Sequence, residues 1–155
     1  MSIDIPGFGA LHIAHLVLDF NGTLAIDGKV LPGVKARLAR LARSTRLHII
    51  TADTFGKARR SLAGVECELT ILGPGSEDRA KAAYVRRLGA GRVVCIGNGR
   101  NDRLMLRTAA LGIAAVQREG AAVEAMRGAD IVVHDVRDAL DLLLQPRRLV
   151  ATLRS

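Results

Sequence analysis

Residues 16–24 read Leu-Val-Leu-Asp-Phe-Asn-Gly-Thr-Leu, and this stretch decides the fold. Its apolar run ends at one carboxylate, Asp19, and the chain then breaks at Gly22. A short apolar run bounded by a turn residue is typical of a buried strand, so we expect a strand over 16–19. In α/β proteins, ligands bind where the carboxyl ends of such strands lie. The stretch therefore predicts a site at Asp19, with its carboxylate as a nucleophile for phosphate.

The rest of the chain alternates short apolar runs with helical patterns. Asp27-Gly28, inside the segment 25–30, predicts a hairpin. This alternation predicts an α/β fold, a Rossmann-like three-layer sandwich whose mostly parallel sheet has helices on both faces. Right-handed crossovers bring the carboxyl ends of the strands to one edge. We expect further strands over 47–50, 68–72, 92–96, 112–116 and 130–133, and helices over 34–43, 76–88, 103–110, 120–127 and 139–144.

Two local signals mark where helices should begin. Ala52-Asp53-Thr54 is expected to cap a helix that begins near Phe55, and Ser76 is expected to be the N-cap of the helix before Gly89. The 155 residues suit a single domain, with 1–15 as a lead-in that is in part an edge strand and 145–155 as a basic C-terminal tail.

Composition restricts the possible partners. Lys and Arg number 23 against 15 Asp and Glu, so the net charge is +8, which attracts polyanions in general. The arginines recur mostly at helical spacing, which favours solvated helix faces over a nucleic-acid-binding stripe. Aromatic residues make up only 3%, which disfavours recognition of bases by stacking. Nucleic acid is therefore not the partner we expect.

The cysteines and the lengths of the apolar runs indicate where in the cell the protein is expected. Cys67 and Cys95 lie far apart, and no histidine near them gives a zinc-site spacing, so neither a disulfide framework nor a zinc site is expected. No apolar run approaches the length needed to span a membrane, and the N-terminus does not follow the pattern of a signal peptide. We expect a cytoplasmic protein with no membrane partner.

Polar residues cluster at the expected carboxyl edge of the sheet. Gly22 and Thr23 provide a tight turn, free N–H groups and a hydroxyl, which suit phosphate oxygens. Thr51 ends the next strand, Lys81 can neutralise phosphate charge, and Asp102 offers hard oxygen to Mg²⁺. Each residue alone has an ordinary structural explanation, but together they are the parts that phosphoryl transfer needs.

These residues also form a recognisable series. Asp-Phe-Asn-Gly-Thr-Leu at 19–24 resembles motif I of the haloacid dehalogenase superfamily. Ile49-Ile50-Thr51 resembles motif II, Lys81 motif III, and Gly-Asn-Gly-Arg-Asn-Asp at 97–102 motif IV. The last is similar to the Gly-Asp-Gly-x-Asn-Asp loop of P-type ATPases and phosphoserine phosphatases. The resemblance spans about 16–144 and is nearest to the small soluble P-type-ATPase-like phosphatases.

The resemblance implies a Mg²⁺-dependent phosphatase or phosphotransferase that works through an aspartyl-phosphate on Asp19. It implies catalytic roles for Asp19, Asn21, Thr51 and Lys81. It implies phosphate binding by Gly22, Thr23, Thr51, Ala52 and Lys81. It implies Mg²⁺ binding by Asp19, Asn98, Asp102 and the backbone carbonyl of Asn21.

Two asparagines depart from the family pattern. Family phosphatases carry a second Asp, the general acid and base, where this chain has Asn21, and an amide cannot exchange a proton usefully near neutral pH. Asn98 replaces an acidic metal ligand, so its oxygen can coordinate Mg²⁺ only without charge. By resemblance, Asn21 predicts slow turnover with a longer-lived phospho-Asp19, and Asn98 predicts weaker Mg²⁺ binding.

The segments 24–50 and 52–79, where family members carry a cap domain, are too short to hold one. An open site suits a phosphoprotein, a polymer, or a small phosphorylated substrate covered by a neighbouring subunit. Capless sugar-acid-phosphate phosphatases form tetramers of that kind, so the resemblance makes a homo-oligomer one expectation. The alternatives to a phosphohydrolase are a non-catalytic phosphate- or partner-binding module and, less favoured, a nucleic-acid-associated protein.

Overall fold

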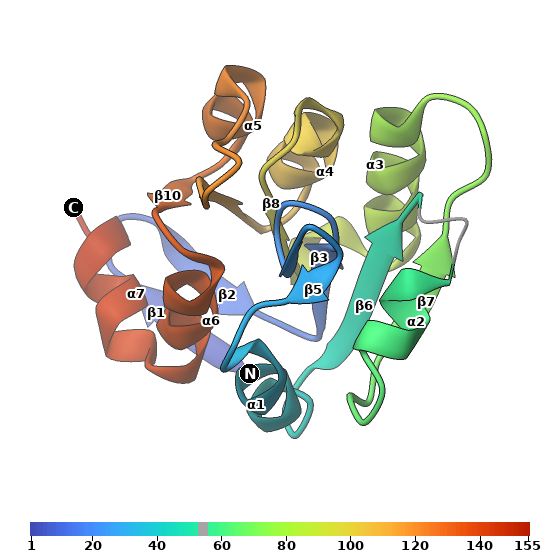
Figure 1. Cartoon of the computed structure of the whole chain (residues 1–155). Coiled ribbons are helices and arrows are strands. Elements are labelled where there is room, and N and C mark those ends of the chain that lie inside the picture. Colours follow the sequence, from blue (N-terminus) through green and yellow to red (C-terminus); the bar gives the residue numbers. More distant parts are fainter. Residues whose placement is uncertain (53–55) are drawn as a thin grey trace.

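The computed structural model describes residues 1–52 and 56–155 (Figure 1). The central strands are β3 (His15–Asp19), β6 (Arg46–Thr51), β7 (Glu68–Ile71), β8 (Val93–Gly97), β9 (Leu111–Ala115) and β10 (Ile131–Val133). They form one sheet in the order β10-β9-β8-β3-β6-β7, and every neighbouring pair is parallel. The predicted α/β fold without a cap domain is confirmed.

Helices cover both faces of the sheet (Figure 1). One face carries α3 (Glu77–Arg87), α4 (Arg103–Thr108) and α5 (Val123–Gly128). The other carries α1 (Val34–Leu41), α2 (Lys57–Ser61) and α6 (Val136–Leu144), while α7 (Pro146–Leu153) packs against α6 and the N-terminal strand β1 (Ser2–Ile5). Two short 3₁₀ turns, η1 (Ala90–Arg92) and η2 (Arg100–Asp102), flank β8.

The middle strand, β3, explains why the opening stretch of sequence is so apolar. Successive side chains of a strand point to opposite faces. Leu16 and Leu18 therefore enter the core under α1 and α6, while Val17 enters the core under α3 and α4. Because helices cover both faces, the strand reads as a continuous apolar run. Asp19 then emerges at the carboxyl edge of the sheet, paired in register with Ile50 of β6.

Both ends of the chain correct the sequence-based prediction. Residues 1–15, expected as a lead-in with part of an edge strand, instead pair with each other: β1 (Ser2–Ile5) and β2 (Gly9–His12) form a separate antiparallel hairpin that buries Ile5 and Leu11. Residues 145–155 are not a tail, because they contain α7, whose Leu149 is fully buried. The two hairpin strands contain no continuous apolar run, because much of each strand is exposed, and the basic composition of α7 concealed its apolar face.

Several local predictions can be compared with the structure. The hairpin over 25–30 is confirmed as β4 (Ala25–Ile26) and β5 (Lys29–Val30), with positive φ at Asp27 and Gly28. Ser76 is the N-cap of α3, but its side chain makes no capping hydrogen bond. The expected cap at 52–54 and the helix start near Phe55 fall largely outside the described residues, and α2 is described from Lys57.

The helix expected over 120–127 begins three residues late. Gly120 has φ +80°, in the left-handed region, so it cannot continue into a helix. Residues 116–122 form a loop instead, and α5 starts at Val123. Within the two described ranges, no helix is both long and apolar enough to cross a membrane.

Candidate active site

Asp19 is the last residue of β3, between β6 and β8 in the middle of the sheet. Its side chain is only 9% exposed. Lys81, which α3 carries into the sheet edge, donates from Nζ to Asp19 Oδ1 at 2.7 Å. The hydroxyl of Thr23 lies 3.2 Å from Asp19 Oδ2. The carboxylate is therefore held on one side by a cation and on the other by the turn that follows its own strand.

Lys81 is shared by two carboxylates. Its Nζ also lies 2.6 Å from Asp102 Oδ1, and the Lys81 side chain is 1% exposed. Burial, together with the negative charge of Asp102, raises the pKa of Asp19 to about 7. Burial alone would lower the pKa of Lys81, but the two carboxylates, Asp19 foremost, hold that pKa above its ordinary value. Lys81 therefore stays protonated, and it faces two acidic side chains, Asp19 and Asp102.

Asp102 organises the fourth motif. Its Oδ2 accepts the backbone N–H groups of Asn98 at 3.0 Å and Gly99 at 2.8 Å, while Oδ1 accepts from Lys81. A Cβ at residue 97 would lie 2.5 Å from the Asp102 carboxylate, which explains the glycine there. Both oxygens of Asp102 are engaged and the residue is fully buried, so in this arrangement it positions Lys81 and the loop.

Thr23 joins the first and fourth motifs. Its hydroxyl lies 3.1 Å from Asn98 Oδ1 as well as 3.2 Å from Asp19 Oδ2. The amide group of Asn98 is oriented by a second bond, from Nδ2 to the carbonyl of Gly120 at 3.1 Å. Two oxygens, one from a carboxylate and one from an amide, therefore converge on the same hydroxyl.

Asn21 is exposed at the mouth of this group and donates from Nδ2 to Thr51 Oγ1 at 3.4 Å. Thr51 is buried at the end of β6, and the residue after it, Ala52, is exposed. Gly22 has φ +78°, which the turn between Asn21 and Thr23 requires. The structure thus gathers the predicted residues of all four motifs at one edge of the sheet.

The loop 116–122, whose last three residues were predicted as helical, also reaches this edge. Gln117 donates from Nε2 to the carbonyl of Thr23 at 2.5 Å, and the N–H of Ala122 donates to the carbonyl of Asn98 at 2.9 Å. The signal available was position, because these residues follow β9 at the same edge of the sheet where Asp19 ends β3. It was missed because the segment from 120 onward was taken as helical.

The oxygen atoms of this site suit Mg²⁺, but they would bind it weakly. Mg²⁺ is held by one or two carboxylates plus waters and substrate phosphate, and Asp19 Oδ2 with Asn98 Oδ1 provides one charged and one neutral oxygen. In the described part of the chain, no group of three or more His, Cys, Asp or Glu side chains is arranged to hold a metal ion. The site therefore needs phosphate oxygens, or a further acid, to complete it.

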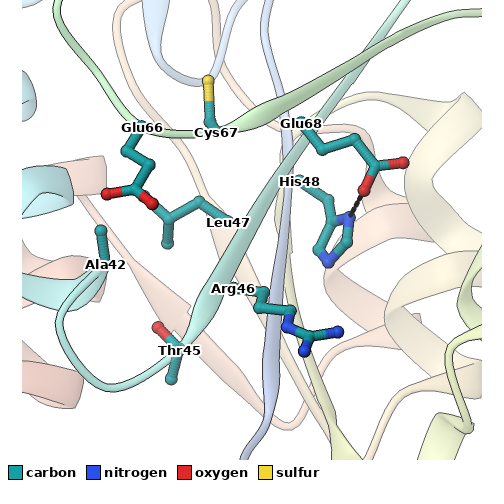
Figure 2. Close-up of a pocket in the computed structure, with 8 residues that line it drawn as sticks. All are labelled: Ala42, Thr45, Arg46, Leu47, His48, Glu66, Cys67 and Glu68. Atoms are coloured by element: carbon teal, nitrogen blue, oxygen red, sulfur yellow. Dashed lines mark ion pairs between the residues drawn. The ribbon is translucent and has the colours of Figure 1, made fainter.

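A pocket of about 350 Å³ lies elsewhere, at the amino end of β6 (Figure 2). Figure 2 shows His48 and Glu68 paired on one side of it, with Cys67 above and Thr45 below. It contains none of the residues predicted from the four motifs. Because ligands of α/β proteins bind at the carboxyl ends of strands, and the clustered polar side chains lie there, the group around Asp19 is the candidate site.

Comparison with known proteins agrees with the fold. No family model matches the chain. Among solved structures, the 3-deoxy-D-manno-octulosonate 8-phosphate phosphatase of Moraxella catarrhalis, in complex with magnesium, phosphate and KDO, is similar with a TM-score of 0.72. It is 18% identical, and the match covers 92% of this chain and 94% of that one. The cobalt-bound enzyme of Haemophilus influenzae matches with a TM-score of 0.72 and 15% identity, over 93% and 94% of the two chains.

A protein from Legionella pneumophila, described as a HAD superfamily (subfamily III A) hydrolase, matches with a TM-score of 0.69 and 18% identity, over 92% and 87% of the two chains. The chain therefore has the capless haloacid dehalogenase fold, which confirms the resemblance at the level of the fold. By sequence, it is 45% identical over 84 residues to the uncharacterised protein MJ0073 of Methanocaldococcus jannaschii, covering 52% of this chain and 90% of that protein. The chain belongs to the same family as MJ0073.

Proposed function

We propose that the chain is a Mg²⁺-dependent phosphohydrolase that forms an aspartyl-phosphate on Asp19. The observation that carries this proposal is the buried Asp19 carboxylate at the end of the central strand, held 2.7 Å from Lys81 Nζ and 3.2 Å from Thr23 Oγ1. The likeness of the fold to phosphatases, one of them in complex with magnesium and phosphate, supports it.

The first step needs an ionised Asp19. One of its oxygens attacks phosphorus, and the bond from phosphorus to the leaving oxygen breaks. Lys81 and the hydroxyls of Thr23 and Thr51 are the groups that would balance charge on the phosphoryl oxygens. Mg²⁺, held by Asp19, Asn98 and the carbonyl of Asn21, would supply further neutralisation when bound. Asp102 keeps Lys81 in place.

Asn21 sets the rate in this proposal. Its position fits that of a general acid and base, because it is exposed beside Asp19 and touches Thr51. An amide cannot protonate the leaving oxygen or accept the proton of the attacking water. The leaving group must then take its proton from water, and water must attack phospho-Asp19 unaided. Turnover is slow, and the phosphorylated state persists.

The test is hydrolysis of a generic phosphate ester with saturating Mg²⁺. Asp19→Asn should abolish it, and Asn21→Asp should raise kcat by roughly 10²- to 10⁴-fold, the usual contribution of a general acid–base. Asn21→Ala is the matched control, because it removes the amide without supplying an acid and should give no gain. If Asn21→Asp and Asn21→Ala behave alike at saturating Mg²⁺, the acid–base argument fails.

A second candidate is a phosphate- or partner-binding module without turnover. Asn98 favours it, because its amide is engaged in structural bonds to Gly120 and Thr23 where an enzyme would carry an acid. This candidate predicts that beryllofluoride or phosphate binds in an Asp19-dependent way while no ester is hydrolysed, even by Asn21→Asp. Small phosphorylated compounds, sugar-acid phosphates among them, are the first substrates to try. A homo-oligomer whose subunits cover the open site is part of the proposal and is tested by light scattering.

A further inference from the structure

We infer that Glu119, at the tip of the loop 116–122, supplies the acidic oxygen that Asn98 lacks and binds a hard divalent cation beside Asp19. Contact is direct or through one of the waters that Mg²⁺ retains. The role of the cation in phosphate hydrolysis rests on the proposed function, but its binding can be measured without any substrate. Glu119 belongs to none of the four motifs.

The loop that carries Glu119 is firmly attached at both ends. At its start, the N–H groups of Val116 and Gln117 donate to the carbonyls of Val133 and His134, each at 2.9 Å. At its end, the N–H of Ala122 donates to the carbonyl of Asn98. The tip between these anchors is therefore held next to the fourth motif.

Two side chains fix the tip against the active site itself. Gln117, with φ +57°, turns its amide to the carbonyl of Thr23, and Asn98 donates from Nδ2 to the carbonyl of Gly120. Glu119 stands between these two contacts in the sequence. The first and fourth motifs thus hold the loop from both sides, and Glu119 cannot lie far from either.

Gly22 shows where the Glu119 carboxylate lies. A Cβ built at residue 22 would be 2.8 Å from Glu119 Oε2, 2.7 Å from Asn98 Nδ2 and 2.9 Å from Asn98 Oδ1. The carboxylate and the amide therefore share the space that the missing side chain of Gly22 leaves open. Glu119 is exposed, and none of the ion pairs within 1–52 and 56–155 includes it, so its charge is available to a cation.

The same contacts explain why residue 98 is an amide. Asp at this position has no N–H to give to the Gly120 carbonyl and would place negative charge against that oxygen. The Asn98 side-chain N–H therefore holds the loop in place through the Gly120 carbonyl, and the loop in turn brings the Glu119 carboxylate to the site. Two acids, Asp19 and Glu119, with the Asn98 oxygen between them make a set of hard oxygen donors that suits Mg²⁺ or Mn²⁺.

The experiment measures Mn²⁺ binding to the intact chain by the loss of the free-ion electron paramagnetic resonance signal, without any substrate. Glu119→Gln should raise the Kd for Mn²⁺ by about tenfold or more. Glu66→Gln makes the same change of charge on an exposed residue at the opposite edge of the sheet and should leave the Kd unchanged. Glu119→Gln should also leave the unfolding temperature of the metal-free protein unchanged, because the side chain is exposed.

The outcomes separate this inference from the proposed function. If Glu119→Gln binds Mn²⁺ like the unaltered chain while Asp19→Asn does not, the role of Glu119 is refuted and the phosphohydrolase proposal stands. If Glu119→Gln alone loses affinity but no variant hydrolyses esters, the phosphohydrolase proposal fails and the role of Glu119 stands. An unaltered chain that binds no Mn²⁺ at millimolar concentration overturns both.

Discussion

Polar side chains gather at both ends of the parallel strands, as charged groups at the carboxyl ends (the carboxyl edge) and as uncharged groups at the amino ends (the amino edge). At the carboxyl edge, Lys81 lies between Asp19 and Asp102 at 2.7 and 2.6 Å. At the amino edge, His15 Nδ1 lies 3.0 Å from His48 Nε2, and His48 Nδ1 lies 2.9 Å from the Tyr84 hydroxyl. The first group consists of ions, and the second is a chain of hydrogen bonds between neutral rings.

One helix serves both groups. Lys81 and Tyr84 are three residues apart on α3, so they lie on the same side of the helix about one turn apart. Tyr84 completes the neutral chain by donating its hydroxyl to Glu68 at 3.0 Å. The neutral chain is satisfied by its own partners, whereas the ionic group has two acids for one cation. Burial therefore encloses a satisfied hydrogen-bond chain at the amino ends of the strands and an unbalanced charge at their carboxyl ends.

Removing the cation should have the largest effect. Lys81→Met leaves two carboxylates buried without a counter-charge, and breaking a buried ion pair from one side costs about 3–5 kcal/mol. Urea unfolding should show this loss in the free energy of unfolding. Lys35→Met, which removes an exposed lysine that donates to the carbonyl of Ala63, is the control and should change little. A loss below about 1 kcal/mol for Lys81→Met, the size of a surface ion pair, would mean that the ionic group is not buried as described.

The next largest effect should be the change in the free energy of unfolding with pH that Asp19 causes. Its pKa is raised from 3.8 to about 7, so the folded state keeps a proton that the unfolded chain releases. The free energy of unfolding should therefore fall as pH rises from about 4 to 7, by up to about 1.4 kcal/mol per pH unit. Asp19→Asn should remove this slope, and infrared spectroscopy of the carboxyl band should place the titration near 7. A carboxyl band that titrates near 4 would contradict it.

At the amino edge, Tyr84→Phe keeps the ring packing but removes the hydroxyl between His48 and Glu68. His48 Nδ1 then keeps Glu68 Oε2, at 3.4 Å, so the loss of the Tyr84 hydrogen bond should cost about 1 kcal/mol of unfolding free energy. Activity toward phosphate esters should not change, because Tyr84 belongs to the other group. A loss of activity at unchanged stability would show that the two edges are coupled through α3.

The smallest effect is expected from the histidines, and it has the opposite sign to that of Asp19. Burial first, and then Arg46 and Arg92, lower the pKa of His15, while burial lowers the pKa of His48 against the raising effect of Glu68. Stability from these rings is complete above their ordinary pKa of 6.5 and is lost as pH falls below it. Thermal unfolding between pH 7 and 5 should show the decline, and His48→Gln should flatten it. If the unfolding temperature of His48→Gln falls as steeply with pH, groups other than His48 cause the decline.

The sequence predicted most of the sheet because its strands are local patterns. The run before Asp19 and the Asp27-Gly28 turn each contain their own signal, and the structure confirms both. The pairing of the terminal hairpin and the helix α7 were missed because the hairpin strands contain no continuous apolar run and a basic helix resembles a tail. The loop over 116–122 was missed because its shape depends on partners far away: Gln117 meets Thr23 at a separation of 94 residues.

The sequence by itself determined that Asp19 ends a buried strand and that Thr51, Lys81 and the segment 97–102 fall at strand or helix positions near it, because periodicity and turn residues act over a few positions. Only the tertiary structure decided that Lys81 is shared between two acids and that Asn98 turns its amide toward the loop of Glu119. The physical reason is that a contact between distant residues depends on the direction each side chain takes once the helices have packed on the sheet.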